Sequence, residues 1–395
     1  MHNQSDRMDQ EEIRGINFDL PKNRSNVIKV LGVGGGGSNA INYMFQQGIR
    51  GVDFIVSNTD AQALAESGVP TKIQLGASLT EGLGAGANPE VGERAALESK
   101  EEIQEILSTQ TKMIFITAGM GGGTGTGAAP IVAQVAKELG ILTVAVVTKP
   151  FELEGSKRMK IAQEGIKELI EEVDSLITIP NQKLLEVLGE DCSMLEAFKQ
   201  ANDVLAGAVR GISDIIIKPG LINVDFADVK TVMSEKGTAM MGTGTASGPD
   251  RARIAAEHAV ASKLLEDISL QDAKGVLVNI TAGPELSLGE IKAVGDCISD
   301  FASEEAIIVT GTVLDDTRGN DLIVTVIATG LSSSLQTISK PSGQVNMLND
   351  RKPLPLSDAA RKMLENPPKV EKIKEKSKDE EDYLDIPSFV RTQLD

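Results

Sequence analysis

The stretch Ile116-Thr117-Ala118-Gly119-Met120-Gly121-Gly122-Gly123-Thr124-Gly125-Thr126-Gly127-Ala128-Ala129-Pro130 decides the fold of this chain. It follows the apolar run 112–116, which reads as a buried strand, and it leads into 131–136, which reads as a helix. Because glycine has no side chain and tolerates positive φ, such a run lets backbone N–H groups converge on an anion at a helix N-terminus. The stretch therefore predicts a cradle for phosphate groups.

Two further glycine-rich turns lie between predicted elements. Gly34 to Asn39 follows a buried strand at 27–33 and precedes a helix expected from Ala40 to about Gln47. Gly82 to Glu90 precedes a helix expected through 95–107. Each turn alone could simply permit a tight connection, but three on alternating strands and helices could surround one polyphosphate.

Two other nucleotide-binding patterns are alternatives to a phosphate cradle of three turns. Gly32, Gly34 and Gly37 satisfy the dinucleotide pattern G-x-G-x-x-G, and Asp60 follows a predicted strand at 52–57, about where a ribose acid would stand. A dinucleotide fold needs only one such loop, however. A P-loop is excluded because none of the three turns carries the G-K-[ST] lysine. Backbone N–H groups, helix dipoles and a bound cation would then meet the phosphate charge.

Composition limits the classes of function. A chain of 395 residues suggests two packed domains with tails, and the 41% hydrophobic share suffices for burial. A net charge of −18 and 3% aromatic residues argue against nucleic-acid binding. No apolar run approaches the roughly 20 residues of a membrane span, and residues 1–26 lack an apolar signal region, so we expect a cytoplasmic protein. Cys192 and Cys297 are expected to be buried free thiols.

Polar side chains follow two later predicted strands. Glu154 and Arg158 come after the strand at 142–147, and Asn181 follows the strand at 176–179. Ligands bind at the carboxyl ends of strands in open parallel sheets, so these residues are candidates for sugar and phosphate contacts. An exposed surface pair is the alternative for Glu154 and Arg158.

A long apolar helix is expected from a capping box at Ser193 to Glu196 up to Lys218. We expect it to be central and to bridge two domains. Phe198, Asn202 and Asp203 lie within about one turn of one another. The two polar side chains could bond the edge of a guanine while Phe198 stacks on it, although Phe198 could equally belong to the core.

Asp225 and Asp228 stand three apart at the head of another helical segment. Helix capping is the structural explanation for such carboxylates. The functional alternative is that they polarise a water molecule or help hold a cation.

The remainder of the chain contains a predicted second domain, followed by a charged linker and an apolar terminal segment. Strands at 275–282, 306–313 and 322–328 with helices at about 251–265 and 288–301 predict a smaller α+β domain. The glycine-rich 242–248 reads as a connection. Residues 369–381 are dense in charge and read as a linker, whereas the apolar 383–391 suggests a segment that folds on a partner, with fraying as the alternative.

The stretch Gly119 to Gly127 resembles the G-G-G-T-G-T-G signature of the tubulin/FtsZ family of GTPases, and of its bacterial cell-division members in particular. The resemblance spans roughly 26–330 and the terminal peptide, and it is supported by 34–39, 58–64, 148–151, 223–228 and 385–389. It implies a tubulin-like α/β fold: a Rossmann-like GTPase domain with a parallel sheet, a central helix and a smaller α+β C-terminal domain. The implied parts are a disordered arm (1–25), the nucleotide-binding domain (26–190), the linking helix (191–220), the C-terminal domain (221–330), a flexible linker (331–381) and a partner-binding peptide (382–395).

The resemblance also implies roles for individual residues. The phosphate loops would comprise Gly35, Gly36, Gly37, Ser38, Asn39, Gly121, Gly122, Gly123, Thr124 and Gly125, with Ser38 standing where many members have Gly. The other nucleotide contacts would be Asn58, Asp60, Ala87 and Asn88 (the last two at the γ-phosphate), Glu154 and Arg158 (ribose and nucleotide), Asn181 (sugar and base), and Phe198, Asn202 and Asp203 (guanine). Asn223, Asp225 and Asp228 match the synergy loop, which completes the catalytic site of the next subunit.

The implied activity is hydrolysis of GTP to GDP, with Mg²⁺ accompanying GTP, coupled to head-to-tail filaments that form the division ring at midcell. The chain itself would be its main partner, and 382–395 would dock on membrane tethers and division regulators, without nucleic acid or direct membrane insertion. Two alternatives stay open: an NAD-dependent oxidoreductase, and a scaffold that binds nucleotide without hydrolysing it.

Overall fold

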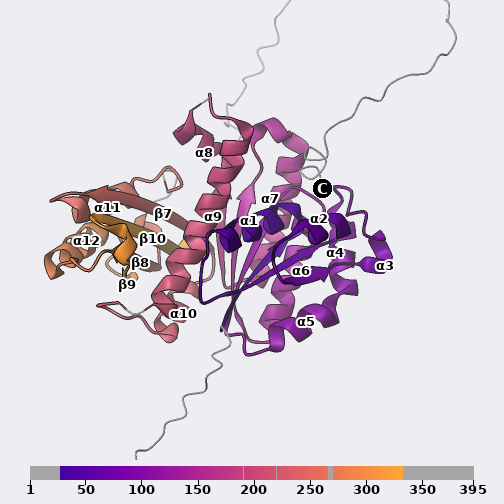
Figure 1. Cartoon of the computed structure of the whole chain (residues 1–395), viewed down its shortest axis with the longest axis horizontal. Helices are drawn as coiled ribbons and strands as arrows, with labels where there is room; N and C mark the ends of the chain where they lie inside the picture. The colour runs from indigo at the N-terminus through magenta and orange to yellow at the C-terminus, as the bar shows by residue number, and fades with distance from the viewer. Residues whose placement is uncertain (1–26, 190, 219, 266–269, 332–395) are drawn as a thin grey trace, which may run out of the picture. The chain divides into compact units, whose positions relative to one another are not determined.

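The computed structural model describes residues 27–189, 191–218, 220–265 and 270–331. Their strands form one ten-stranded sheet in the order β3-β2-β1-β4-β5-β6-β7-β10-β8-β9 (Figure 1). The strands are β1 (Ile28–Val33), β2 (Asp53–Asn58), β3 (Thr71–Gln74), β4 (Met113–Gly119), β5 (Leu142–Lys149), β6 (Ser175–Pro180), β7 (Thr238–Ser247), β8 (Gly275–Ala282), β9 (Ile307–Leu314) and β10 (Asp321–Leu331). The α-helices are α1 (Gly34–Gln46), α2 (Ala61–Glu66), α3 (Ala77–Thr80), α4 (Pro89–Glu98), α5 (Lys100–Ser108), α6 (Thr124–Glu138), α7 (Ser156–Glu172), α8 (Asn181–Leu188), α9 (Met194–Ile217), α10 (Phe226–Met233), α11 (Arg251–Val260) and α12 (Leu288–Phe301).

The first six strands have the order of a doubly wound nucleotide-binding fold. They pair in parallel as β3-β2-β1-β4-β5-β6, which is the Rossmann order. Every residue of β1 is buried, as expected for a parallel strand covered on both faces. Helices α1 and α9 pack on one face of these strands, and α4, α5, α6 and α7 pack on the other. The predicted α/β class with a parallel sheet is thus confirmed.

Helix α9 joins the two halves of the sheet. It begins after Ser193, whose hydroxyl accepts from the Glu196 N–H while the Glu196 carboxylate accepts from the Ser193 N–H. Its buried side chains share one apolar core with residues of both halves, such as Val146 of β5 and Leu277 of β8. The long apolar helix is therefore packed on both halves at once (Figure 1).

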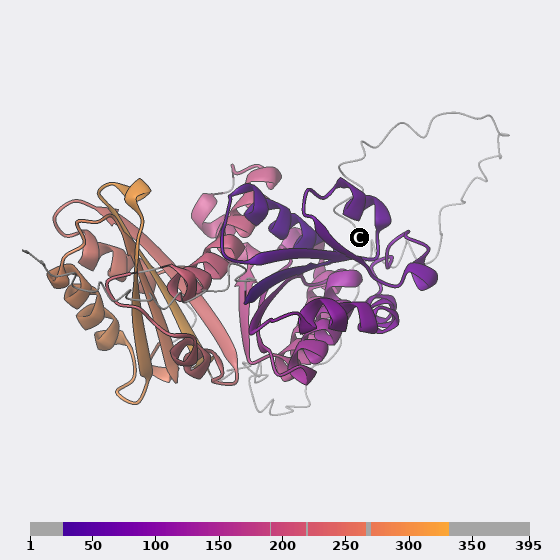
Figure 2. The ribbon, with the colours of Figure 1, turned by 60° about the horizontal axis from the view of Figure 1, so that its bottom comes forward.

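The C-terminal part is built on β7, β10, β8 and β9. Strand β10 pairs antiparallel with β7 and β8, and β8 pairs parallel with β9. Helices α11 and α12 cover one side of these strands, as Figure 2 shows, and enclose a separate apolar core. This matches the predicted smaller α+β domain, although β7 joins it to the first sheet through a short parallel pairing with β6.

The expected connection at 242–248 is wrong, because Gly242 to Ser247 lie within β7. A β-carbon on Gly242 would lie 2.0 Å from the carbonyl oxygen of Ala259, and one on Gly244 would lie 2.0 Å from that of Ala255. The glycines are therefore present because α11 packs directly on the strand backbone, which is a common reason for glycine inside a strand.

Several helix boundaries also differ from expectation. Helix α1 begins at Gly34 rather than Ala40, and α6 begins at Thr124, so both glycine runs form the first turns of helices. The helix expected through 95–107 is two helices, α4 and α5, which meet at Ser99. Helix α11 ends at Val260, short of the expected 265.

Three remaining expectations concern thiols, membranes and tails. Cys192 and Cys297 are free thiols, as expected, but they are half-buried rather than buried. No helix in the described ranges is long and apolar enough to cross a membrane. The arm at 1–25 and the peptide at 382–395 lie outside the described residues, as does all of the linker except Leu331, which ends β10. The proposed division into domains stays a prediction.

Candidate functional site

The turns β1–α1 and β4–α6 approach each other so closely that only glycine fits between them. A β-carbon on Gly34, whose φ is +71°, would lie 2.7 Å from the N atom of Gly125. One on Gly36 would lie 3.0 Å from the Cα of Gly119. Because α1 and α6 both begin here, two helix N-termini with their unpaired N–H groups meet at the edge of the sheet. This arrangement suits an anion.

A pocket of 130 Å³ opens beside these turns. It is lined by Gly35, Gly36, Asn39, Gly119, Met120, Gly122, Gly125, Thr148, Glu154, Arg158, Asn181, Phe198, Ala201, Asn202 and Leu205. Ten of the residues named from the sequence are among them, drawn from both glycine turns, the 3-10 turn Glu152–Glu154, α7, α8 and α9. Segments that are distant in sequence thus meet around one cavity.

Glu154 and Arg158 form an ion pair on the wall of this pocket. The distance between Arg158 Nη1 and Glu154 Oε2 is 2.9 Å, and the side chains are only 24% and 16% exposed, respectively. The other carboxylate oxygen of Glu154 accepts a hydrogen bond of 2.8 Å from the Phe151 N–H. The pair is therefore held in place, and the alternative of an exposed surface pair does not describe it.

The lining of the pocket includes a buried polar atom that has no hydrogen-bond partner among the described residues. Asn181 is 4% exposed, and its Oδ1 accepts no hydrogen bond. Burying such an atom is costly unless a ligand or water molecule pairs with it. Phe198 lies on the same wall, with its ring edge-to-face against the buried Phe151 at 5.3 Å between centroids. These features suit a ligand with a flat ring and hydrogen-bonding groups.

A second, polar recess of 260 Å³ adjoins the pocket and shares Gly35 and Asn39 with it. Ser38, Asn58 and Asp60 also line this recess. The Ser38 Oγ is buried and unpaired, and one Asp60 carboxylate oxygen caps α2 by accepting from Gln62 and Ala63. A hydrated divalent cation with phosphate ligands needs only one or two carboxylates from the protein. The recess fits such a cation.

The glycine-rich turn at 82–90 packs against the β4–α6 turn and lines neither cavity. A β-carbon on Gly123 would lie 2.8 Å from the N atom of Asn88 and 3.2 Å from that of Ala87. Ala87 has a φ of +55°, and the Asn88 side chain caps α4 by accepting from Glu90 N. The turn is thus fixed directly against the start of α6.

Other predicted phosphate-loop residues lie beneath the surface. Thr124 is 2% exposed, and its hydroxyl lies 2.6 Å from that of Thr59. A β-carbon on Gly37 would lie 2.4 Å from the carbonyl oxygen of Thr117, and one on Gly121 would lie 2.8 Å from that of Arg158. These residues line neither cavity and instead allow the close packing around them.

Two groups of predicted residues are not brought to the pocket. Asp203 lies outside the lining, and its carboxylate accepts a hydrogen bond from the hydroxyl of Tyr43. Asn223, Asp225 and Asp228 are exposed and lie past the other end of α9. The rise of a helix places Ile217 about 18 Å beyond Leu205, the last pocket residue on α9. Figure 1 shows α8 beside the start of α9 and α10 beside its end.

The local structure at these aspartates is that of a helix cap. Asp225 Oδ1 accepts from the Asp228 N–H at 2.9 Å, which starts α10. Asn223 Oδ1 accepts from the Gly220 N–H at 2.8 Å. The capping explanation therefore holds for Asp225, whereas the exposed carboxylate of Asp228 has no hydrogen-bond or ion-pair partner among the described residues.

Sequence reasoning missed three lining residues that have recognisable signals. Thr148 lies near the carboxyl end of β5, where ligands are expected. Ala201 and Leu205 share a helix face with Phe198 and Asn202 at spacings of three and four. Across the described ranges, no group of three or more His, Cys, Asp or Glu side chains could by itself hold a metal ion.

Comparisons with known proteins place this site in a family. Residues 27–189 match the Tubulin/FtsZ family, GTPase domain, and residues 237–332 match the FtsZ family, C-terminal domain. The chain is 57% identical over 400 residues to the cell division protein FtsZ of Pseudomonas putida, covering 96% of this chain and 100% of the relative. It is 55% identical over 394 residues to the FtsZ of Azotobacter vinelandii, with coverage of 96% and 100%.

Solved structures agree with this placement. An empty FtsZ dimer from M. jannaschii has a TM-score of 0.73 and 44% identity, covering 77% of this chain and 88% of that one. The GDP-bound CetZ1 monomer from Haloferax volcanii has a TM-score of 0.68 over 78% of this chain and 94% of that one, but at 18% identity it shows the shared fold alone. The chain therefore belongs to the Tubulin/FtsZ family of GTPases, among the FtsZ cell-division proteins.

Proposed function

We propose that the chain binds GTP in the pocket between α1, α6 and α9 and hydrolyses it to GDP and phosphate only when assembled head to tail with further copies of itself. The observation that carries this proposal is the separation of Asp225 and Asp228 from the pocket along the length of α9. A subunit cannot bring its own carboxylates to its own nucleotide, so a neighbouring subunit must supply them.

The pocket offers a suitable partner for each part of a guanosine nucleotide. The N–H groups at the starts of α1 and α6 bind phosphate oxygens, and the turn of Ala87 and Asn88 lies next to them at the γ-phosphate. Glu154 and Arg158 bind the ribose and phosphates, while Asn181 satisfies its unpaired Oδ1 at the sugar or base. Phe198 stacks on the guanine, and Asn202 bonds its edge.

Mg²⁺ is expected to accompany GTP. Ser38 and Asp60 in the adjoining recess are the residues that would face it, together with the phosphate oxygens. Bound there, the cation supplies charge neutralisation at the γ-phosphate.

Exposed apolar side chains lie in the segments around both ends of α9, which suits contact between copies. Near the pocket, Leu153, Val187 and Leu195 are 63%, 64% and 77% exposed. At the other end, Leu221 and Ile222 are 53% and 40% exposed. A contact that joins two different surfaces, and that does not close into a ring, generates a filament. Loss of the γ-phosphate removes charge and a cation from this contact and weakens it.

In the cell, such filaments would form the division ring at midcell in the cytoplasm, in keeping with the cell-division relatives. Residues 382–395 would connect them to membrane tethers and division regulators. The alternative of an NAD-dependent oxidoreductase leaves the glycine turn at Gly121 to Gly127 without a role. The non-catalytic scaffold leaves the exposed Asp228 without one.

A mixing experiment tests the shared site. Asp228→Ala should bind GTP but hydrolyse it poorly, because its own loop cannot complete a neighbour's site. Gly122→Asp places a carboxylate among the phosphate-binding N–H groups and should prevent GTP binding while leaving its Asp228 intact. Phosphate release is measured for each variant and for an equal mixture, with light scattering to follow assembly.

The mixture should recover up to about a quarter of the parental rate, since half of the pockets bind GTP and half of the loops are intact. GTP alone should raise the scattering, and ATP or NAD should not. A mixture no more active than the sum of its separate components would contradict the shared site. So would an Asp228→Ala chain that hydrolyses GTP at the parental rate without assembling.

A further inference from the structure

A hydrogen bond between distant side chains ties the two helices that wall the pocket. The hydroxyl of Tyr43 on α1 donates to the carboxylate of Asp203 on α9, across 160 positions of sequence. Tyr43 follows Asn39 by one helical turn, and Asp203 follows Asn202 directly. Both of these neighbours line the pocket. The tie therefore lies just behind the residues that would touch the ligand.

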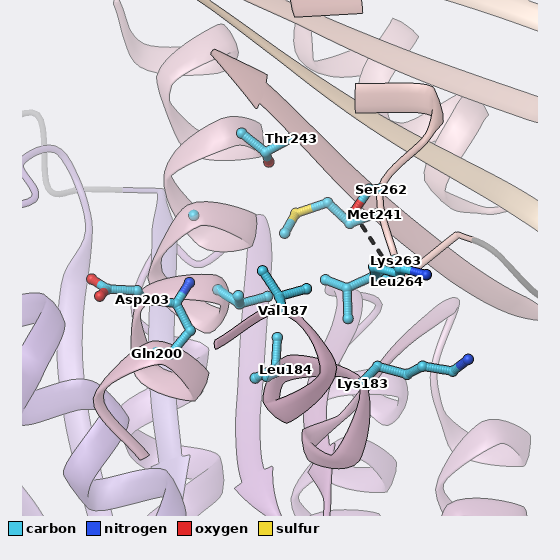
Figure 3. Close-up of a pocket in the computed structure, with 12 residues that line it drawn as sticks. Lys183, Leu184, Val187, Gln200, Asp203, Met241, Thr243, Ser262, Lys263 and Leu264 are labelled. Carbon is cyan, nitrogen blue, oxygen red and sulfur yellow. Dashed lines mark hydrogen bonds between the residues drawn. The ribbon is translucent and has the colours of Figure 1, made fainter. Parts of the chain in front are cut away.

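The surroundings of the pair favour a defined geometry. The Tyr43 ring is half-buried and packs against the main apolar core, which fixes the ring from which the more exposed hydroxyl projects. Asp203 lies at the edge of a neighbouring groove of 360 Å³ lined by α8, α9, β7 and 262–264. Figure 3 shows its carboxylate pointing away from the apolar side chains of that groove, such as Val187 and Leu184. The carboxylate of Asp203 therefore points toward Tyr43 of α1, while the residue itself borders the groove.

The face of α9 that lines the pocket excludes Asp203. Phe198, Ala201, Asn202 and Leu205 form that face, whereas Asp203 stands about 100° further round the helix from Asn202. A carboxylate that bonds a guanine edge would have to leave Tyr43 and cross to the next face. This places the base-reading role on Asn202.

We infer that Tyr43 and Asp203 are a positioning pair, which fixes the separation between the phosphate-binding helix α1 and the base-binding helix α9, and that Asp203 is not a reader of the base. This inference rests on the proposed function, because it concerns the same nucleotide pocket. A positioning pair affects all ligands of the pocket alike. A base reader instead affects ligands according to the groups on their base.

The contact itself can be tested without nucleotide. The chain has two tyrosines and no tryptophan, so a Tyr383→Phe chain reports Tyr43 alone. The hydrogen bond to Asp203 raises the pKa of Tyr43 above the ordinary 10.0, and this outweighs the lowering by the charge of Arg210. Absorbance titration of the phenol should therefore give a midpoint above 10.0 that falls when Asp203→Asn is added. Circular dichroism at each pH ensures that the chain is folded.

The role of the pair is tested by affinity. Tyr43→Phe keeps the ring and its packing, and Asp203→Asn removes the charge. Tyr43→Phe removes the donor and should weaken GDP binding about fivefold, whereas Asp203→Asn keeps an amide oxygen that can accept and should weaken binding less. The double variant should be no weaker than Tyr43→Phe alone, because the tie is already lost there. The ratio of the Kd values for inosine and guanosine diphosphate should stay at its parental value. Asp296→Asn, an exposed carboxylate on α12, is the matched control and should change nothing.

Each possible failure has a distinct meaning. An unshifted Tyr43 midpoint, or a double variant that binds GDP more weakly than Tyr43→Phe alone, would overturn the pair. A changed inosine-to-guanosine ratio in Asp203→Asn would show that Asp203 reads the base. A parental chain that binds no guanine nucleotide would overturn the proposed function, and the role of the pair with it, even where the titration succeeds.

Discussion

Replacing Gly123 by alanine should separate the binding of GTP from that of GDP. Gly123 is the residue before α6 and has a φ of −80°, so the backbone accepts alanine without strain. The new β-carbon, however, would lie 2.8 Å from the N atom of Asn88 and 2.9 Å from the Cβ of Ala85. Ordinary contacts begin at 3.4 Å, so the 85–88 turn must move away by about 0.6 Å.

The size of the effect follows from this displacement. Overpacking of this kind costs about 1–3 kcal/mol, which corresponds to a few degrees in Tm for a chain of this size. The turn is the predicted contact of the γ-phosphate, whereas the α- and β-phosphates are predicted to face the N-termini of α1 and α6. We therefore expect GTP to bind about tenfold more weakly, a loss of about 1.4 kcal/mol, with less than a twofold change for GDP.

The measurement is equilibrium binding of a non-hydrolysable GTP analogue and of GDP, at concentrations too low for assembly. Gly295→Ala on α12 is the control, because a β-carbon there meets no atom within 4 Å. It should leave both affinities unchanged and stabilise the helix by up to about 1 kcal/mol. Equal losses for both nucleotides, or no loss for the triphosphate, would refute the assignment of this turn to the γ-phosphate.

Two further predictions concern stability and the base. In Glu290→Gln, the buried Arg251 loses the carboxylate that accepts from its Nε at 2.6 Å, so stability at pH 7 should fall by about 3 kcal/mol in urea unfolding. The hydrogen bond from Arg251 holds the pKa of Glu290 below 4.5. The parent is therefore more stable than Glu290→Gln above pH 4.5, and this difference in the free energy of unfolding is lost as pH falls through the lower folded pKa. An equal difference in the free energy of unfolding at pH 7 and pH 3 would contradict this. Phe198→Ala should weaken GTP and GDP alike by about tenfold, and an effect on one nucleotide only would argue against stacking on the base.

The fold class could be predicted from the sequence because its strongest signals are local. Buried apolar strands followed by glycine runs identify β1 and β4 and the cradle at their ends. The extent of the helices could not be predicted in the same way, since glycine has a poor intrinsic helix propensity. In Gly37 the lack of a side chain serves tertiary contact with Thr117, which overrides propensity and starts α1 early. Strand β7 could not be predicted for the same reason, because its glycines disfavour a strand by propensity but allow close contact with α11.

The candidate site likewise contains residues that the sequence predicts and contacts that depend on tertiary packing. Residues at the ends of strands, such as Glu154 and Asn181, are predictable because the topology of a parallel sheet brings them to one edge. The Tyr43–Asp203 contact is not predictable from the sequence, because it depends on how α1 and α9 pack together and not on any spacing in the chain. The same holds for the separation of Asp228 from the pocket, which is set by the length of α9.

The core that runs beneath α9 also governs which pieces of this protein can be produced alone. A fragment ending near residue 190 would lack the side chains that cover Val146 and Ile177. The bared sheet face would be a strong site for aggregation. Expression trials that dissect the chain should therefore keep α9 attached to the first six strands, and a C-terminal fragment would need Met241 and Leu277 made polar to remain in solution.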